Sequence, residues 1–73
     1  MITFDPRPQK IFMKMNSKVQ QDIMNTLHEL EREPQLRKRH GGSKIYTVRV
    51  GHYCIGYLPI DDVIRVLQIR KIK

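Results

Sequence analysis

The sequence predicts an α+β fold: a short N-terminal strand, a helical hairpin, and then a three-stranded antiparallel meander, with the helices on one face of an antiparallel sheet. Three observations support it. Residues 46–57 alternate in polarity around a two-residue turn, residues 17–33 repeat apolar residues every three or four positions, and residues 63–69 are rich in β-branched residues. With 73 residues, the chain is predicted to be a single domain covering residues 1–73.

The predicted hairpin has one face that is apolar and one that is not. Its two apolar series are separated by Gly51 and His52, and consist of Tyr46, Val48, Val50, Tyr53, Ile55 and Tyr57. Pairing Val50 with Tyr53 places both series on one face, whereas a slip of one residue scatters them over both faces. Gly51 at the first turn position favours a type II′ turn. The opposite face then carries Thr47, Arg49, Cys54 and Gly56.

The N-terminal half is predicted to form a short strand, residues 2–4, and two helices. Asp5 and Pro6 are typical of a helix start, and a helix through residue 15 would bury Ile11, Phe12 and Met15. Ser17 and Gln20 have the spacing of a capping box that opens the second helix. Pro34 is expected to end that helix. Its buried stripe is predicted to be Val19, Ile23, Leu27 and Leu30, with Met13, Met15 and Met24 as further core residues.

The net charge of +7 lies wholly in the second half of the chain. Lys and Arg balance Asp and Glu through Pro34, whereas from Gln35 onward nine basic residues face only Asp61 and Asp62. One loop gathers a basic cluster, Arg37, Lys38, Arg39 and His40. A basic surface of this kind indicates a polyanionic partner, most often nucleic acid, although a solvated basic face without a partner is the alternative.

The single cysteine, Cys54, excludes an intramolecular disulfide and a metal site built on paired cysteines. No metal or other cofactor is expected. No apolar run is long enough to span a bilayer, and no signal peptide is visible at the N-terminus. The sequence therefore predicts a cytoplasmic protein with no membrane partner. It indicates no oligomeric state.

The segment from Tyr46 to Tyr57 resembles a motif of the RelE/ParE superfamily of toxins from type II toxin–antitoxin systems, Tyr-Arg-x-Arg-Val-Gly-Asp-Tyr-Arg-Ile-x-Tyr. The resemblance continues through Val66-Leu67-Gln68-Ile69 and the basic tail, and covers nearly the whole chain. It implies a RelE-like toxin that cuts mRNA on the ribosome without a metal, inhibits translation, stabilises plasmids and is neutralised by a cognate antitoxin. The partners expected from it are the antitoxin, the ribosome and mRNA.

The resemblance also suggests site residues. Arg49 matches a position of the family's active face and is the first candidate for phosphate binding. Arg70, Lys71 and His52 complete the candidate catalytic set. The candidate RNA-binding residues are Arg37, Lys38, Arg39, His40, Lys44 and Lys73.

Two departures keep alternatives open. Thr47 stands where the family usually has a basic residue, and Cys54 where it has Arg. The alternatives are a catalytically weakened or inactive RelE-fold protein that binds RNA, ribosome or antitoxin, and a ParE-like inhibitor of DNA gyrase.

Overall fold

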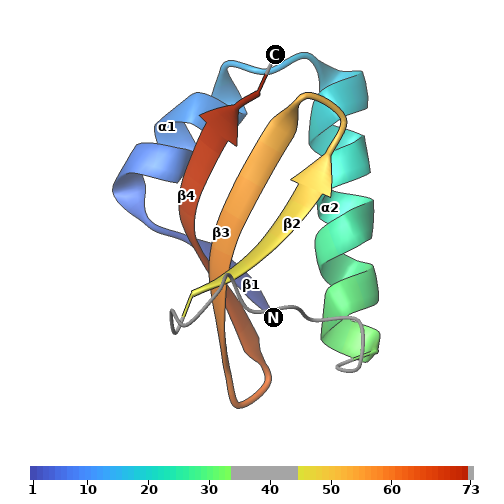
Figure 1. Cartoon of the computed structure of the whole chain (residues 1–73), viewed down its shortest axis with the longest axis vertical. Helices are drawn as coiled ribbons and strands as arrows, with labels where there is room; N and C mark the ends of the chain where they lie inside the picture. Colours follow the sequence, from blue (N-terminus) through green and yellow to red (C-terminus); the bar gives the residue numbers. More distant parts are fainter. Residues whose placement is uncertain (34–44, 73) are drawn as a thin grey trace.

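A computed structural model of the chain describes residues 1–33 and 45–72. The helices and strands are β1 (Ile2–Phe4), α1 (Pro6–Met13), α2 (Ser17–Arg32), β2 (Tyr46–Val50), β3 (Tyr53–Ile60) and β4 (Val63–Lys71). The strands form one sheet in the order β1-β4-β3-β2, and the two helices pack against it (Figure 1). The predicted α+β fold, with its helical hairpin and antiparallel meander, is confirmed.

The sheet is mixed rather than antiparallel throughout, and in this detail the sequence prediction was wrong. β1 runs parallel to β4, with Ile2 opposite Ile64 and Phe4 opposite Val66. A backbone hydrogen bond beyond the end of β1 extends this pairing: the Asp5 amide donates to the Val66 carbonyl at 2.9 Å. β4 therefore lies between β1 and β3, which confirms the prediction of an interior strand.

The β2–β3 hairpin has the predicted register. Val50 lies opposite Tyr53, Val48 opposite Ile55 and Tyr46 opposite Tyr57. Gly51 has a φ of 59°, while His52 is not among the described residues with positive φ. Positive φ at the first turn residue alone is the requirement of a type II′ turn, so the role predicted for Gly51 is confirmed.

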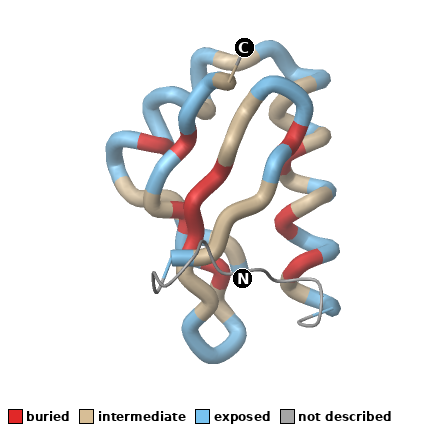
Figure 2. The backbone as a smooth tube through the Cα atoms, viewed as in Figure 1, coloured by how far each residue is buried: buried red, intermediate tan, exposed pale blue. Residues whose placement is uncertain are grey.

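The core lies between α2 and the helix-facing side of the sheet. Ile23, Leu27 and Leu30 of α2 are buried there, as the predicted stripe required, and Val19 and Met24 pack against them partly exposed. The sheet contributes Val50, Ile55, Tyr57, Ile64, Val66 and Ile69. Figure 2 shows these buried positions on the central strands and along the side of α2 that faces the sheet.

Both helix starts differ in detail from the sequence prediction. The N-cap of α2 is Asn16, whose Oδ1 accepts from the Val19 amide at 2.9 Å, so Ser17 is not the cap. Gln20 does not reach back to the cap either, because its Nε2 donates to the Phe12 carbonyl at 2.8 Å. Asp5 occupies the N-cap position of α1, but its side chain makes no capping bond.

α1 is shorter and less buried than predicted. It ends at Met13 rather than residue 15, and Pro8 is its buried residue. Ile11 is 42% exposed and Met13 is 69% exposed, so neither is a core residue, whereas Phe12 and Met15 do pack against the core. A helix of eight residues offers only a narrow stripe to the sheet, which explains why part of its apolar surface stays outside.

A bulge in β4 decides which side chains leave the core. Tyr57 lies opposite Val66 and Gly56 opposite Gln68, so Leu67 has no partner on β3. The alternation shifts by one residue at this point, and Val66 and Ile69 are both buried although they are three positions apart. Gln68 and Arg70 consequently lie on the sheet face away from the helices, here called the outer face.

Candidate functional site

The outer face carries two arginines on either side of a cysteine. Arg49 on β2 is the register partner of Cys54 on β3, and Cys54 is in turn the partner of Arg70 on β4. Neighbouring strands are about 4.8 Å apart, so the Cα atoms of the two arginines are about 10 Å apart. Both arginines are exposed, and both side chains are long enough to reach over Cys54.

The adjoining row of the outer face is uncharged. It consists of Thr47, Gly56 and Gln68, again register partners across three strands. Gly56 is buried beneath its neighbours, because a Cβ at this position would meet carbons of Gln68 and Ile45 at 3.5 Å each. The arginine row is thus bordered by an uncharged row, in which the side chain of Ile45 lies beside Gly56.

The four predicted catalytic residues lie at one end of the sheet. Arg49 Nε donates to the Gly51 carbonyl at 3.2 Å, which holds the guanidinium near the β2–β3 turn. His52 is exposed in that turn, and its carbonyl accepts from the amide of Ile72, just after β4. The acidic pair Asp61 and Asp62 occupies the β3–β4 turn at the opposite end of the sheet (Figure 1).

The bulge separates two consecutive cations of the predicted site. Arg70 faces outward beside Cys54, whereas Lys71 is the register partner of Tyr53 and lies on the helix side of the sheet. Arg49 and Arg70 therefore share a face, Lys71 does not, and His52 lies at the turn. The predicted RNA-binding residues Arg37, Lys38, Arg39, His40, Lys44 and Lys73 lie outside the described residues, and their roles stay predictions.

An ion pair that the sequence did not predict lies farther along the outer face. Arg65 Nε donates to Asp5 Oδ1 at 2.8 Å, and Arg65 Nη2 lies 3.4 Å from Asp5 Oδ2. The hydrogen bond that Arg65 donates to Asp5, and then the negative charge of Asp5, raise the pKa of Arg65. This two-point contact joins the start of α1 to β4 and neutralises one cation of the outer face. Sixty residues separate the partners, so no local pattern indicates the contact.

Among residues 1–33 and 45–72, no three His, Cys, Asp or Glu side chains gather where they could hold a metal ion. Neither helix of the described part of the chain is long and apolar enough to cross a membrane. The outer face itself carries the exposed guanidinium groups of Arg49 and Arg70, the half-buried thiol of Cys54 and hydroxyl of Thr47, and the exposed amide of Gln68.

Solved structures of a bacterial toxin share this architecture. A chain of the intact E. coli RelBE toxin–antitoxin complex matches with a TM-score of 0.79 and 25% identity, over 100% of this chain and 96% of that chain. The isolated E. coli RelE toxin matches with a TM-score of 0.81 and 25% identity, over 100% of this chain and 84% of the other. This chain has the RelE-like toxin fold. The resemblance inferred from the hairpin motif is thereby confirmed.

A third match is E. coli RelE in the free state with two arginines replaced by alanine. Its TM-score is 0.78 at 26% identity, over 97% of this chain and 81% of that chain. Neither a protein-family model nor a curated protein sequence matches the chain. The RelE-like similarity accordingly lies in the three-dimensional structure, at an identity of 25–26%.

Proposed function

We propose that this protein is a RelE-like toxin that cuts mRNA on the ribosome as a metal-independent endoribonuclease, and that a cognate antitoxin neutralises it. The observation that supports this most is the pair Arg49 and Arg70, exposed on one face across three strands. No carboxylate of the described residues is paired with either arginine. Their positive charges are thus available to an anionic ligand.

The proposed reaction is an internal transfer within the RNA. The 2′-oxygen attacks the adjacent phosphorus and loses its proton, the bond from phosphorus to the 5′-oxygen breaks, and that oxygen gains a proton. The products are a 2′,3′-cyclic phosphate and a 5′-hydroxyl. Negative charge grows on the non-bridging oxygens in the transition state, and preorganised donors aimed at it lower the barrier. Arg49 and Arg70 supply these donors in the proposal, since guanidinium matches phosphate in a two-point contact.

Proton transfer is assigned to His52 in this proposal. It is an exposed imidazole in the turn directly after the strand that carries Arg49. Imidazole changes charge near neutral pH and is the commonest general acid or base in enzymes.

A second candidate, an RNA-binding RelE-like protein with little catalytic power, is favoured by one observation. The positions between and beside the two arginines are Thr47, Cys54 and Gln68, none of which is an amine or imidazole. Such a surface binds phosphate but brings no proton-transferring group directly to it.

Cleavage of mRNA on programmed ribosomes distinguishes the two candidates. The variants are Arg49→Ala and Arg70→Ala, with Arg32→Ala on the exposed end of α2 as a control of equal charge change. Loss of one transition-state donor is expected to reduce the cleavage rate about 10²- to 10³-fold. The control is expected to cleave like the wild type. Intact mRNA with a wild-type protein that still binds the ribosome would contradict the endoribonuclease and support the second candidate.

A further inference from the structure

A third arginine lies on the outer face, and the proposed reaction does not use it. Arg65 on β4 is the register partner of Thr3 on β1 and of Leu58 on β3. Its side chain is on the same strand as that of Arg70, and at about 3.3 Å per residue the two Cα atoms are roughly 16 Å apart. The outer face therefore offers guanidinium groups at two separate places along β4.

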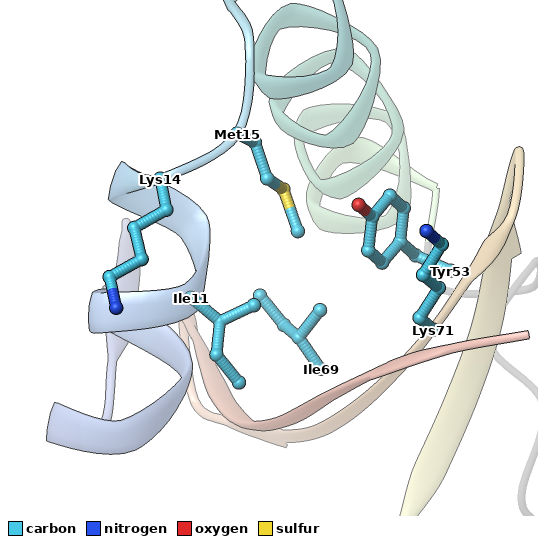
Figure 3. Close-up of a pocket in the computed structure, with 6 residues that line it drawn as sticks. All are labelled: Ile11, Lys14, Met15, Tyr53, Ile69 and Lys71. Carbon is cyan, nitrogen blue, oxygen red and sulfur yellow. The ribbon is translucent and has the colours of Figure 1, made fainter.

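The lysine of β4 does not join these arginines. Lys71 is opposite Tyr53 and lines a pocket on the helix side of the sheet, together with Ile69 (Figure 3). It is the only lysine that the described part of the chain places in a strand. An RNA phosphate that approaches the outer face of the described strands thus meets guanidinium near Arg70 or near Arg65.

The second of these places is occupied by a side chain of the protein itself. Arg65 Nε donates to Asp5 Oδ1 at 2.8 Å, and Arg65 Nη2 lies 3.4 Å from Asp5 Oδ2. Guanidinium holds phosphate in the same two-point manner. The pair lies at the surface, with 51% of the Arg65 side chain and 30% of the Asp5 side chain exposed. The carboxylate consequently takes the position that a phosphate would take.

The backbone holds this carboxylate beside β4. The Asp5 amide donates to the Val66 carbonyl at 2.9 Å, and the Asp5 carbonyl accepts from the Gln9 amide at 3.0 Å. The side chain of an N-cap residue usually accepts from the second or third residue of its helix. The third residue of α1 is Pro8, which has no amide hydrogen, and the Asp5 side chain makes no capping bond. The carboxylate is thus left to Arg65.

We propose that Asp5 is a positioning residue that sets the register of RNA on the outer face. By neutralising Arg65, it leaves the row of Arg49 and Arg70 as the place on the described strands where phosphate binds best. An Arg65 without its partner would hold RNA roughly 16 Å away from this row and from His52, where the RNA would not be cut. The inference rests on the proposed function, which places cleavage at the His52 end of the sheet.

The first test measures binding of a single-stranded RNA oligonucleotide to the whole chain by fluorescence anisotropy. Asp5→Asn removes the charge but keeps the shape of the side chain. It is expected to tighten RNA binding about 1.5- to 5-fold, the range expected when an exposed ion pair no longer competes. Addition of Arg65→Ala should restore the wild-type affinity. Glu33→Gln, exposed at the end of α2, is a control with the same charge change.

Amide chemical shifts locate the RNA without any need for cleavage. In the wild type, RNA is expected to shift the amide signals of Cys54 and Arg70 and to leave those of Thr3 and Leu58 in place. Asp5→Asn should add shifts at Thr3 and Leu58. Arg65→Ala in the same chain should remove these added shifts.

Cleavage of mRNA on programmed ribosomes gives a kinetic readout of the same effect. Binding in an unproductive register lowers kcat and KM by one factor, because kcat/KM compares only the free enzyme with the transition state. Asp5→Asn should therefore lower both about 1.5- to 5-fold at constant kcat/KM, and Arg65→Ala should restore both. Direct action of the Asp5 charge on the cleaved phosphate is screened, since roughly 16 Å exceeds the Debye length of about 8 Å.

Unchanged RNA affinity in Asp5→Asn would overturn the proposal, as would equal tightening with and without Arg65 or in Glu33→Gln. A lower KM with an unchanged kcat would also overturn it, because Arg65 would then extend the productive site. A wild type that leaves mRNA intact would refute the proposed cleavage alone. The amide shifts would still decide the role of Asp5, since Asp5→Asn without new shifts at Thr3 and Leu58 would refute it.

Discussion

Removing the two outer arginines should change the salt dependence of RNA binding by a calculable amount. Each phosphate neutralised on a single strand releases about 0.7 counterion, so the slope of log affinity against log salt falls by about 0.7 per contact. Arg49→Ala with Arg70→Ala should therefore reduce the slope by about 1.4. Over a fourfold rise in salt, the wild type should lose about sevenfold more affinity than the double variant.

The measurement is a set of anisotropy titrations with one RNA oligonucleotide between about 50 and 200 mM salt. Arg32→Ala is the control, since it lowers the net charge by one from the exposed end of α2. If the two arginines bind phosphate directly, Arg32→Ala should keep the wild-type slope of log affinity against log salt. An unchanged slope in the double variant, or an equal fall in the control, would refute the assignment of Arg49 and Arg70 to phosphate binding.

Three further predictions concern single contacts. Asp5→Asn removes the ion-pair partner of Arg65 and should add about 0.7 to the salt slope for RNA, measured by the same titrations. Asn16→Ala should lower the free energy of unfolding by about 1 kcal/mol, which is roughly 4–8 °C in melting temperature, whereas Ser17→Ala should leave both almost unchanged. A larger loss of stability for Ser17→Ala than for Asn16→Ala would support the capping box predicted from the sequence. Gly51→Ala, at a φ of 59°, should lower the free energy of unfolding by about 1–2 kcal/mol, measured by urea denaturation. An unchanged urea midpoint would argue against the type II′ turn.

The elements predicted best are those whose pattern of apolar residues continues over many positions. The β2–β3 register followed from six alternating apolar residues, because every other register exposes them to water. The stripe of α2 was equally well determined, since its three buried members all lie against the sheet. In both cases a single apolar face selects one arrangement.

The parts predicted poorly are those that depend on one residue or on distant contacts. A three-residue strand carries no information about its direction, so the parallel pairing of β1 could not be predicted. Asn16 and Ser17 are adjacent cap-forming residues, and only the backbone geometry distinguishes them. The exposure of Ile11 depends on how α1 packs on β4, which the period of the helix does not fix.

The bulge at Leu67 limited the prediction of the site most. In a regular strand, the burial of Val66 would place Arg70 on the helix side and Lys71 on the outer face. The extra residue reverses this assignment, and the burial of Ile69 shows which arrangement the core favours. The sequence predicted two cations at the end of β4, but the bulge decides which one faces Cys54.

An exchange of these two neighbours tests that consequence. Arg70→Lys combined with Lys71→Arg keeps composition and net charge, but it moves the guanidinium from the outer face to the helix side of the sheet. A lysine retains the charge but lacks the planar fork that holds phosphate at two points, so the salt slope should stay constant while mRNA cleavage falls about tenfold or more. Wild-type cleavage by the exchanged protein would show that the outward residue at the end of β4 acts only through its charge, and the two-point phosphate contact assigned to Arg70 would have to be abandoned.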